Sequence, residues 1–321
     1  MSLKIKKTLE KAKKIALLGH IHPDGDCLGS MLGLWALLEK QGKKVNYFTP
    51  TTPSTVFDFL PWIKKIKTSF DFGAYDVLLF VDFSEVNRFS EEIRNYLNGA
   101  NILVIDHHLA DVPKNALVIK DAESMSTAEI VFEYAYAWRP TLFTPQIATY
   151  LYMWLTMDSG NFVYDVDHER IFRNALQLVQ LWADKWLIVD QLIRRKSLDA
   201  VRFMEVFLHR MKLQGDILYS YYTEKDFDTY HLDDEEAWYG LKIIQDIYGP
   251  RLVLVFKKVV GILRCSLRSK KTAWKVVDCN LIAKYFGGGG HKPAAGFSLP
   301  MAGKLEDQME KIVKEIGKMI K

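Results

Sequence analysis

The residues best suited to chemistry lie in a short loop that follows the first apolar segment of the chain. The sequence GHIHPDGDCLGS, residues 19–30, offers one imidazole and two carboxylates as His20, Asp24 and Asp26. Nitrogen and oxygen donors of these types suit Mn²⁺, Mg²⁺ or Zn²⁺. The alternative is a polar loop whose aspartates cap the next helix. This loop by itself does not decide between the two.

Three later segments are also followed by acidic or imidazole side chains. These side chains are Asp82, the run Asp106, His107 and His108, and finally Asp158. Each could singly be a helix cap or a satisfied polar group at the end of a strand. Four such ends in one sheet are hard to assign to chance, because ligands of open α/β sheets gather beyond the carboxyl ends of the strands.

Together these positions provide more metal ligands than one catalytic ion needs. The candidates are His20, Asp24, Asp26, Asp82, His107 and Asp158. Two hydrolytic metal ions, roughly 3.5–4 Å apart, can share a bridging carboxylate and a hydroxide that attacks phosphorus. The sequence shows no Ser-His-Asp or Cys-His signature for a protein nucleophile. The residues therefore predict a two-metal centre for phosphate-ester hydrolysis.

The elements that must position these ligands alternate between short apolar segments and helical patterns. The predicted strands are Lys14–Gly19, Lys44–Phe48, Val77–Val81, Ile102–Ile105 and Leu117–Ile119. The predicted helices are Gly29–Gln41, Ser126–Trp138 and Pro145–Met157. Continuous apolar strands separated by helices indicate an α/β fold with a doubly wound, mostly parallel sheet covered on both faces.

A second pattern follows a long helical stretch. We predict a metal-binding domain at residues 1–185, a helical connector at 186–214, and a second, smaller α/β domain at 215–321. The second domain has predicted strands at 218–223, 252–257 and 259–267, and predicted helices at 235–248, 278–286 and 301–321. A length of 321 residues is comfortable for two cores.

A glycine run in the second domain is the other candidate binding element. The residues Gly287, Gly288, Gly289 and Gly290 precede His291 and lie inside a predicted domain, where a flexible linker is not expected. Glycine lets a ligand approach the backbone closely, and its amide groups can hold a phosphate. With Arg268 and Ser269 at the end of a predicted strand, the run and His291 form a predicted clamp for a terminal nucleotide phosphate.

Composition restricts the class of protein further. Hydrophobic residues make up 49% and charged residues 26%, as in an ordinary globular protein. A net charge of +4 permits a phosphate-bearing ligand but does not predict a long nucleic-acid groove. No segment approaches the roughly 20 apolar residues of a membrane span, and the basic N-terminus lacks the pattern of a signal peptide. With three cysteines and no metal-finger spacing, we expect a cytoplasmic protein.

The ordered segments resemble a known family. GHIHPDGDCLGS, VDFSE, IDHH and MDSGNF are similar to the successive motifs of the DHH phosphoesterase superfamily. In the second domain, SLRSK and FGGGGHKPAAGF resemble the signature of the DHH-associated C-terminal domain. The resemblance spans almost the whole chain, and the ordered set of motifs is highly specific.

The resemblance implies a role for each ligand. One ion would take His20, Asp24 and Asp82, and the other would take Asp26, Asp82, His107 and Asp158, with Asp82 as the bridge. His108 would contact the scissile phosphate, and Asp106 would orient the neighbouring histidines. The family also implies Mn²⁺ as the preferred ion with Mg²⁺ as the alternative, a homodimer, and substrate recognition by the second domain.

For function, the chain resembles the nanoRNase/pAp phosphatases. These enzymes degrade RNA of a few nucleotides and remove the 3′-phosphate of 3′-phosphoadenosine 5′-phosphate (pAp). The alternative is a stand-alone phosphodiesterase for cyclic di-AMP or its linear product pApA. Val163 follows Phe162 where many nanoRNases have an arginine, and Met157 replaces a frequent threonine, so substrate preference stays open.

Two further expectations concern the use of the site. A non-catalytic nucleotide sensor would be expected to have lost at least one metal ligand, whereas all six are present here. We also expect a cleft between the two domains, with the metals on one wall and Gly287–His291 on the other. The distance between the two walls would limit substrates to a few nucleotides.

Overall fold

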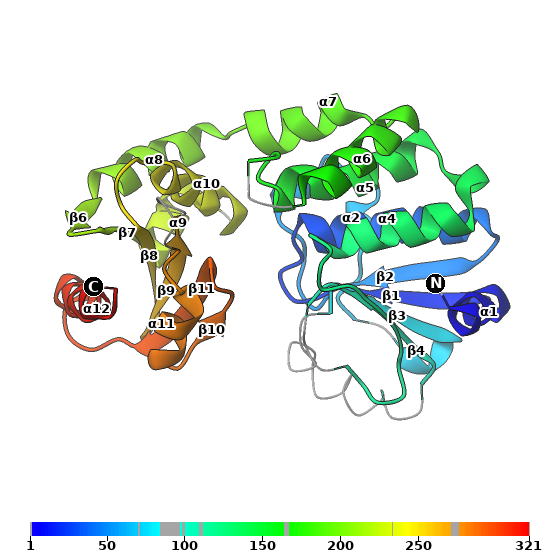
Figure 1. Cartoon of the computed structure of the whole chain (residues 1–321), viewed down its shortest axis with the longest axis horizontal. Helices are drawn as coiled ribbons and strands as arrows, with labels where there is room; N and C mark the ends of the chain where they lie inside the picture. The colour runs from blue at the N-terminus through cyan, green and yellow to red at the C-terminus, as the bar shows by residue number, and fades with distance from the viewer. Residues whose placement is uncertain are drawn as a thin grey trace. The chain divides into compact units, whose positions relative to one another are not determined.

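The computed structural model describes residues 2–69, 71–83, 97, 100–108, 112–163, 167–232, 234–270 and 276–320. The chain divides into two compact units, Met1–Arg195 and Lys196–Lys321, and each has its own sheet (Figure 1). The second unit begins inside the segment 186–214, which the sequence assigns to a connector. Within the described residues, no helix combines the length and the apolar character needed to cross a bilayer.

The sheet of the first unit has five parallel strands. They are β1 Lys14–Leu18, β2 Lys44–Phe48, β3 Val77–Val81, β4 Ile102–Asp106 and β5 Leu117–Lys120, in the order β2-β1-β3-β4-β5. Alternate residues of β1 enter different cores, with Ile15 and Leu17 on one face and Ala16 and Leu18 on the other. The predicted α/β class, with a mostly parallel sheet and a second α/β unit, is confirmed.

Helices follow the strands as the sequence pattern predicts. The first unit contains α1 Leu3–Lys11, α2 Gly25–Lys40, α4 Thr127–Trp138, α5 Pro145–Asp158, α6 His168–Gln180 and α7 Lys185–Ile188, with a π-helical turn at Val189–Arg194. Short 3₁₀ turns lie at Thr55–Phe57, Ile63–Lys65, Phe72–Ala74 and Pro140–Leu142. Helices α2, α4 and α5 bury the larger core against one face of the sheet (Figure 1).

Two predicted helix boundaries were wrong at candidate site residues. Helix α2 begins at Gly25 and not near Gly29, because the Asp24 carboxylate accepts hydrogen bonds from the backbone N–H groups of Asp26 and Cys27, both at 3.1 Å. Asp26 therefore lies in the first turn of a helix and not in a loop. Helix α5 includes Asp158 as its last residue, so this aspartate also has a helical backbone.

A stripe of glycines brings α2 close to α5. Gly25, Gly29 and Gly33 recur every four residues and so share one face of α2. A Cβ atom at Gly29 would lie 2.8 Å from the Tyr150 carbonyl oxygen, and one at Gly25 would overlap the side chain of Met157. The structure therefore explains Gly29 by helix packing. This packing sets the first turn of α2 against the C-terminal end of α5.

Replacing Gly29 with alanine is expected to destabilise the protein by about 1–3 kcal/mol, because the obstructing atom belongs to the backbone and cannot rotate away. The matched control is Gly317→Ala in α12, where the nearest atom is 4.0 Å from the added Cβ. That substitution should stabilise the protein by up to about 1 kcal/mol through helix propensity. Urea denaturation measures the free energy of unfolding of both variants. Equal effects of the two substitutions would contradict the packing argument.

The second unit has a six-stranded mixed sheet. Its strands are β6 Lys212–Gln214, β7 Ile217–Thr223, β8 Leu252–Val259, β9 Ile262–Ser269, β10 Gly289–Gly290 and β11 Ala294–Pro300, in the order β10-β11-β9-β8-β7-β6. Only β7 and β8 pair in parallel. Strands β6, β10 and β11 were missing from the prediction. Strands β6 and β10 have only three and two residues, whereas the alternation of Ala295, Phe297 and Leu299 in β11 was overlooked.

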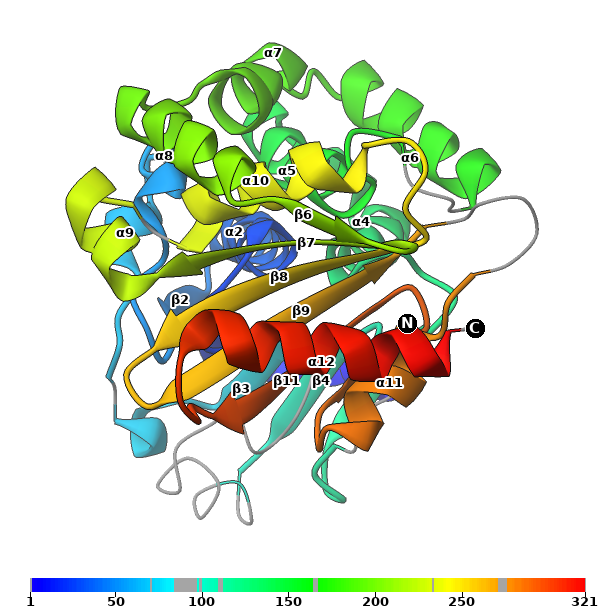
Figure 2. The same cartoon turned by 90° about the vertical axis from the view of Figure 1, so that its left-hand side faces the viewer.

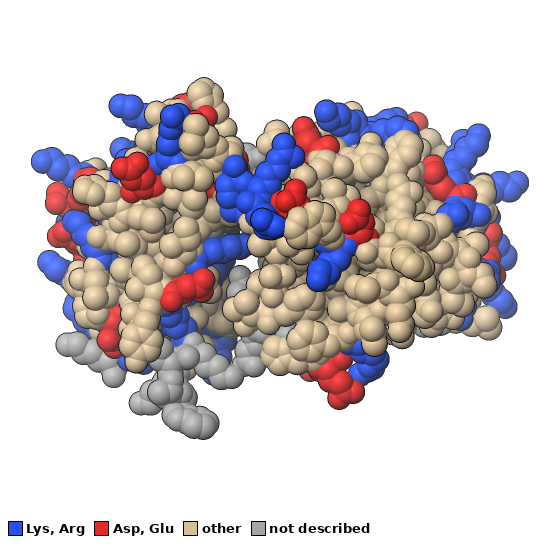
Figure 3. Space-filling model, turned by 90° about the horizontal axis from the view of Figure 1, so that it is seen from above, with Lys and Arg blue, Asp and Glu red and all other residues tan. Residues whose placement is uncertain are grey.

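Helices cover both faces of this second sheet. They are α8 Leu198–His209, α9 Glu224–Tyr230, α10 Asp234–Gln245, α11 Cys279–Tyr285 and α12 Leu305–Met319. Helices α11 and α12 bury one core and α8 and α10 the other, and Figure 2 shows α12 lying along the sheet. On the face drawn in Figure 3, lysine and arginine side chains are interspersed with acidic ones, in keeping with the small net charge.

Candidate metal centre

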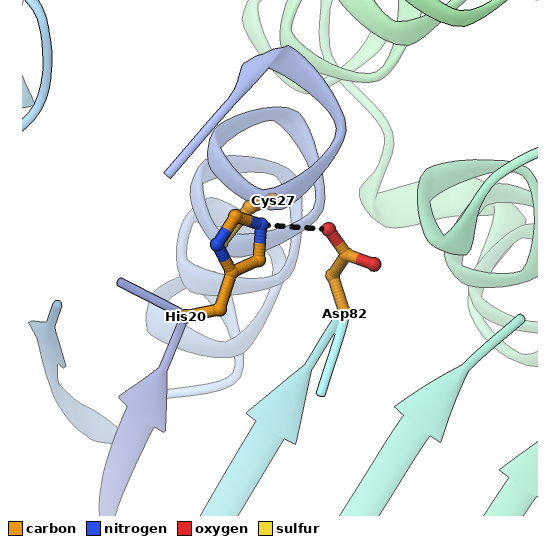
Figure 4. A group of neighbouring side chains, drawn as sticks. All are labelled: His20, Cys27 and Asp82. Atoms are coloured by element: carbon orange, nitrogen blue, oxygen red, sulfur yellow. Dashed lines mark hydrogen bonds and ion pairs between the residues drawn. The ribbon is translucent and has the colours of Figure 1, made fainter. Parts of the chain in front are cut away.

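The candidate ligands of the first unit lie at one edge of its sheet. His20 follows β1 by two residues, Asp82 directly follows β3, and His107 directly follows β4. Because the strands are parallel, their carboxyl ends meet at the same edge. Figure 4 shows His20 and Asp82 extending from two neighbouring strand ends toward the first turns of α2.

Asp82 lies at the centre of the cluster. Its Oδ2 atom is 3.1 Å from His20 Nε2 (the dashed line in Figure 4), and its Oδ1 atom is 3.2 Å from His108 Nδ1 and 3.8 Å from His107 Nε2. The backbone of Asp82 has a φ of 53°, a left-handed conformation that is uncommon for residues other than glycine. Burial would raise the pKa of this carboxyl, but the hydrogen bonds to His108 and His20 lower it well below its usual range.

Asp26 is held by backbone groups from a distant part of the chain. Its Oδ2 and Oδ1 atoms accept hydrogen bonds from the N–H groups of Thr127 and Ala128, both at 2.8 Å, at the N-terminus of α4. His107 Nε2 lies 3.9 Å from Asp26 Oδ2. Burial and the charges of Asp82 and Asp24 raise the pKa of Asp26 well above its usual value.

Asp158 completes the acidic group. Burial and then the charges of Asp26, Asp24 and Asp82 raise its pKa well above the usual value. Asp158 ends α5, and its neighbour Met157 lies against Gly25 in the first turn of α2, next to Asp26. Its Oδ2 atom is buried and has no hydrogen-bond partner among the described residues. Asp26, Asp82 and Asp158, from three separate elements, therefore share one site, although their roles as ligands stay a prediction.

These residues fit divalent cations. Burial and the repulsion between neighbouring carboxylates raise the pKa values of Asp26 and Asp158, and the buried oxygens Asp106 Oδ2 and Asp158 Oδ2 have no hydrogen-bond partner among the described residues. Burial lowers the pKa of His20, but its hydrogen bonds to Asp24 and Asp82 raise it to about 10. A divalent cation would balance the negative charge of these carboxylates, because it can bind the carboxylate oxygens and neutral imidazoles directly.

Asp106 orients His108. Its Oδ1 atom accepts hydrogen bonds from the backbone N–H of His108 at 3.1 Å and from His108 Nδ1 at 2.9 Å. Burial lowers the pKa of His108, but the hydrogen bonds to Asp106 and Asp82 raise it to about 10. Since Nδ1 is engaged in this way, Nε2 is the His108 nitrogen left for a ligand.

Asp106→Asn is expected to lower kcat for phosphoester hydrolysis by roughly 10–100-fold, because the imidazole of His108 loses the carboxylate that orients it. The affinity for Mn²⁺, measured by titration calorimetry, should change much less, because Asp106 itself is not a proposed ligand. A variant with unchanged kcat would show that the contact between Asp106 and His108 is only structural.

The structure adds one residue that the sequence did not single out. The sulfur of Cys27 lies with a His20 nitrogen and an Asp82 oxygen in a group whose atoms are all within 4.8 Å of one another (Figure 4). Burial and the charges of Asp82 and Asp24 raise the pKa of this thiol well above its usual value. It is therefore a neutral, buried group beside the site. The only hint in the sequence was its position next to Asp26.

The predicted phosphate clamp lies wholly in the second unit. Arg268 pairs with Ala294 in the sheet, and the Ser269 N–H donates to the Pro293 carbonyl at 2.8 Å, so β9 runs beside the segment that follows His291. The Ser269 hydroxyl accepts from the Val277 N–H at 2.7 Å, and His291 is exposed. These positions are neighbours in the sheet, and their role in binding stays a prediction.

Backbone geometry explains three glycines of the run. Gly287, two residues after the end of α11, has a φ of 79°, and a Cβ atom at Gly288 would overlap the backbone of Gly296. Gly290 has a φ of 144°, and its Cβ would lie 2.6 Å from the Ala295 Cα. Gly288 and Gly290 therefore serve the close approach of β10 to β11, Gly287 serves the positive φ, and only Gly289 of the four is free of both constraints.

Comparisons with known proteins find relatives of the first unit and of the whole chain. Residues 14–153 match the N-terminal domain of the DHH family. The bifunctional oligoribonuclease and PAP phosphatase NrnA of Bacillus subtilis (strain 168) is 24% identical, with 98% of this chain and 99% of the relative covered.

Residues 14–153 of this chain are a DHH-family domain.

Solved structures share the fold of this DHH protein. A crystal structure of an exopolyphosphatase-related protein from Bacteroides fragilis superimposes with a TM-score of 0.85 at 24% identity, covering 97% of this chain and 94% of that chain. RecJ from Thermus thermophilus in complex with Mn²⁺ gives a TM-score of 0.58 at 18% identity, covering 98% of this chain and 54% of that chain.

Proposed function

We propose that this DHH protein hydrolyses phosphate esters of very short nucleotide substrates at a centre with two divalent metal ions. The observation that carries the proposal is the position of the Asp82 carboxylate, which lies within 3.2 Å of both His20 and His108. Asp26, His107 and Asp158 surround it, and one oxygen of Asp158 has no partner among the described residues. We infer that this group of donors binds a pair of cations and does not serve only as a hydrogen-bond network.

The donors divide into two sets that share Asp82. His20, Asp24 and Asp82 would hold one ion, and the second ion would be held by Asp26, Asp82, His107 and Asp158. We propose Mn²⁺ as the preferred metal, with Mg²⁺ as the alternative, since both accept carboxylate and imidazole ligands. Ions held there would supply a nucleophile from water at neutral pH and neutralise charge on the phosphoryl oxygens.

The protein's own groups would orient the substrate and move a proton. Asp106 engages Nδ1 of His108, so His108 Nε2 is the atom that can donate to a phosphoryl oxygen as negative charge develops there. In the second unit, Arg268, His291 and the open backbone at Gly289 are proposed to bind the terminal phosphate of the substrate. Binding of the terminal phosphate would make the enzyme prefer substrates that carry a phosphate at that end.

The names of the relatives support the substrate class. A bifunctional oligoribonuclease and PAP phosphatase that aligns over nearly the whole chain supports short oligoribonucleotides and pAp as substrates. The exposed Val163, where many nanoRNases have an arginine, keeps hydrolysis of cyclic di-AMP or pApA as the alternative. Phosphate contacts at that position would be missing here.

The deciding experiment compares substrates side by side. The Mn²⁺-loaded protein would be incubated with pAp, pApA, cyclic di-AMP, an RNA of a few nucleotides and a long RNA, and the products separated by ion-exchange chromatography. We expect AMP from pAp, mononucleotides from the short RNA, and little product from the long one. Cleavage restricted to cyclic di-AMP and pApA would favour the alternative. A folded protein that binds Mn²⁺ yet cleaves none of the five would favour a nucleotide sensor.

A further inference from the structure

One short segment supports two of the proposed metal ligands. His107 Nδ1 lies 3.3 Å from the Ser124 carbonyl oxygen, which can only accept, so Nδ1 carries the proton and Nε2 faces Asp26 and Asp82. Asp26 receives its two hydrogen bonds from Thr127 and Ala128, a few residues later. Residues 121–128 therefore determine both the tautomer of His107 and the direction of the Asp26 carboxylate.

A buried glutamate holds this segment in place. Glu129 Oε2 accepts hydrogen bonds from the Ser124 hydroxyl at 2.8 Å and from the Met125 N–H at 3.0 Å, and Oε1 accepts from Asn174 Nδ2 at 2.8 Å. The side chain is almost fully buried, so its charge needs a compensating partner. The Glu129 N–H in turn donates to the Ser126 hydroxyl that caps α4.

Arg170, in the first turn of α6, is the cationic partner of Glu129. It also binds Asp121, the first residue of the segment 121–128. Its Nη2 atom donates to Asp121 Oδ2 at 2.9 Å and to Glu133 Oε2 at 2.7 Å, and its Nε atom donates to Glu133 Oε1 at 2.9 Å. The same Nε lies 3.5 Å from Glu129 Oε2. The guanidinium of Arg170 thus joins Asp121, at the start of residues 121–128, to Glu129 and Glu133 of helix α4. A lysine has no planar fork to reach three carboxylates at once.

We propose that Glu129 and Arg170 are positioning residues of the metal centre, which fix residues 121–128 so that His107 and Asp26 face Asp82. Neither Glu129 nor Arg170 contacts the side chain of a proposed ligand. The inference rests on the proposed function, because it concerns how that centre is assembled.

The first test replaces Arg170 with methionine, which keeps the apolar length of the side chain and removes the guanidinium. We expect Mn²⁺ affinity, measured by titration calorimetry, to fall roughly 10–100-fold, as for other groups that orient metal ligands. The value of kcat should fall with it, while KM for pAp should stay unchanged within about two-fold. Arg170→Lys should recover part of the affinity, because an ammonium can pair with one carboxylate of the group.

Arg173→Met is the matched control. Arg173 lies one turn further along α6, is exposed, and pairs only with Glu169 at 3.0 Å among the described residues. Its loss should leave both Mn²⁺ affinity and kcat unchanged. A folded Arg170→Met protein that binds Mn²⁺ as tightly as the control would overturn the proposal.

A second variant and a metal-independent measurement complete the test. Ser124→Ala removes the hydroxyl that joins the segment to Glu129 and serves in case Arg170→Met does not fold. In the metal-free proteins, ¹H–¹⁵N correlation spectra of the imidazoles should show His107 as a single Nδ1–H tautomer in the wild type and as a mixture in Arg170→Met and Ser124→Ala. Unchanged tautomers in both variants would contradict the inference. If the tautomer of His107 changes in the variants as expected but the wild type binds no Mn²⁺, the positioning role stands and the proposed function is contradicted instead.

Discussion

Asp82→Asn is expected to lower kcat/KM for hydrolysis of pAp or bis(p-nitrophenyl) phosphate by at least about 1,000-fold, which corresponds to several kcal/mol of lost charge stabilisation. The carboxylate is the group common to both proposed ion sites, and it contacts His20 and His108 directly. An amide carries no charge and offers only one acceptor oxygen, so it cannot bridge two cations. Steady-state kinetics with saturating Mn²⁺ measure the loss.

The control for this substitution is Asp76→Asn, at the residue just before the N-terminal end of β3. Asp76 precedes β3 and accepts hydrogen bonds from the backbone N–H groups of Lys13 and Lys14 at 2.7 and 2.8 Å. Asp76→Asn should retain activity, because these contacts are remote from the site at the carboxyl ends of the strands. Comparable activity losses in the two variants would show that Asp82 acts through folding and not through the proposed centre.

Asp158→Asn is expected to have opposite effects with and without metal. In the metal-free protein it removes a carboxylate that is repelled by Asp26, Asp24 and Asp82 and has one oxygen without a partner among the described residues, so thermal stability should stay equal or rise. Saturating Mn²⁺ should raise the Tm of the wild type by about 5 °C or more, as expected for ligand at about 100 times its Kd. The variant should lose most of that increase and about 100-fold in kcat.

Differential scanning calorimetry in EDTA and in Mn²⁺ measures the two effects on Tm. Asp167→Asn is the matched control, because Asp167 caps α6 and asparagine caps a helix equally well. This control should show the full increase in Tm with Mn²⁺. If Asp158→Asn destabilised the metal-free protein and kept the full metal effect, Asp158 would be a structural cap and not a ligand.

Stability without metal should fall as pH rises from about 7 to about 9, and Mn²⁺ should remove much of this fall. The pKa values of Asp26, Asp158 and His20 are raised in the folded state, the last to about 10. The stability that His20 contributes is therefore complete below its unfolded value of about 6.5 and is lost as pH approaches its folded pKa. The lowered pKa of Asp82 adds no slope there, because its contribution is already complete above about pH 4.

The measurement is the difference in Tm between Mn²⁺ and EDTA as a function of pH. Other titrating groups contribute equally to both curves, so the difference isolates the site. It should grow with pH, because cation binding displaces protons from these ligands. A difference that is constant from about pH 7 to about pH 9 would show that these groups bind no extra protons in the folded state.

Much of the first unit could be predicted from local patterns in the sequence. The strands at residues 44–48 and 77–81 appear as uninterrupted apolar runs, because a parallel sheet buries both of its faces. The placement of His20, Asp82 and His107 at one edge of the sheet was predictable, because the carboxyl ends of parallel strands lie at the same edge. The start of α2 was misplaced because Asp24 serves as a helix cap as well as a candidate ligand.

The sequence by itself determined which residue types stand at the strand ends, and hence the family and the class of chemistry. Only the tertiary structure decided how those residues are held. Asp26 is directed by Thr127 and Ala128, 101 and 102 residues away, and the clamp of Arg170 on Asp121 spans 49 residues. Such contacts follow no local periodicity, because they arise from the packing of whole helices against one another and against the sheet. The need for glycine at positions 25, 29 and 288 could not be predicted either, because it depends on which atoms of a neighbouring element lie against them.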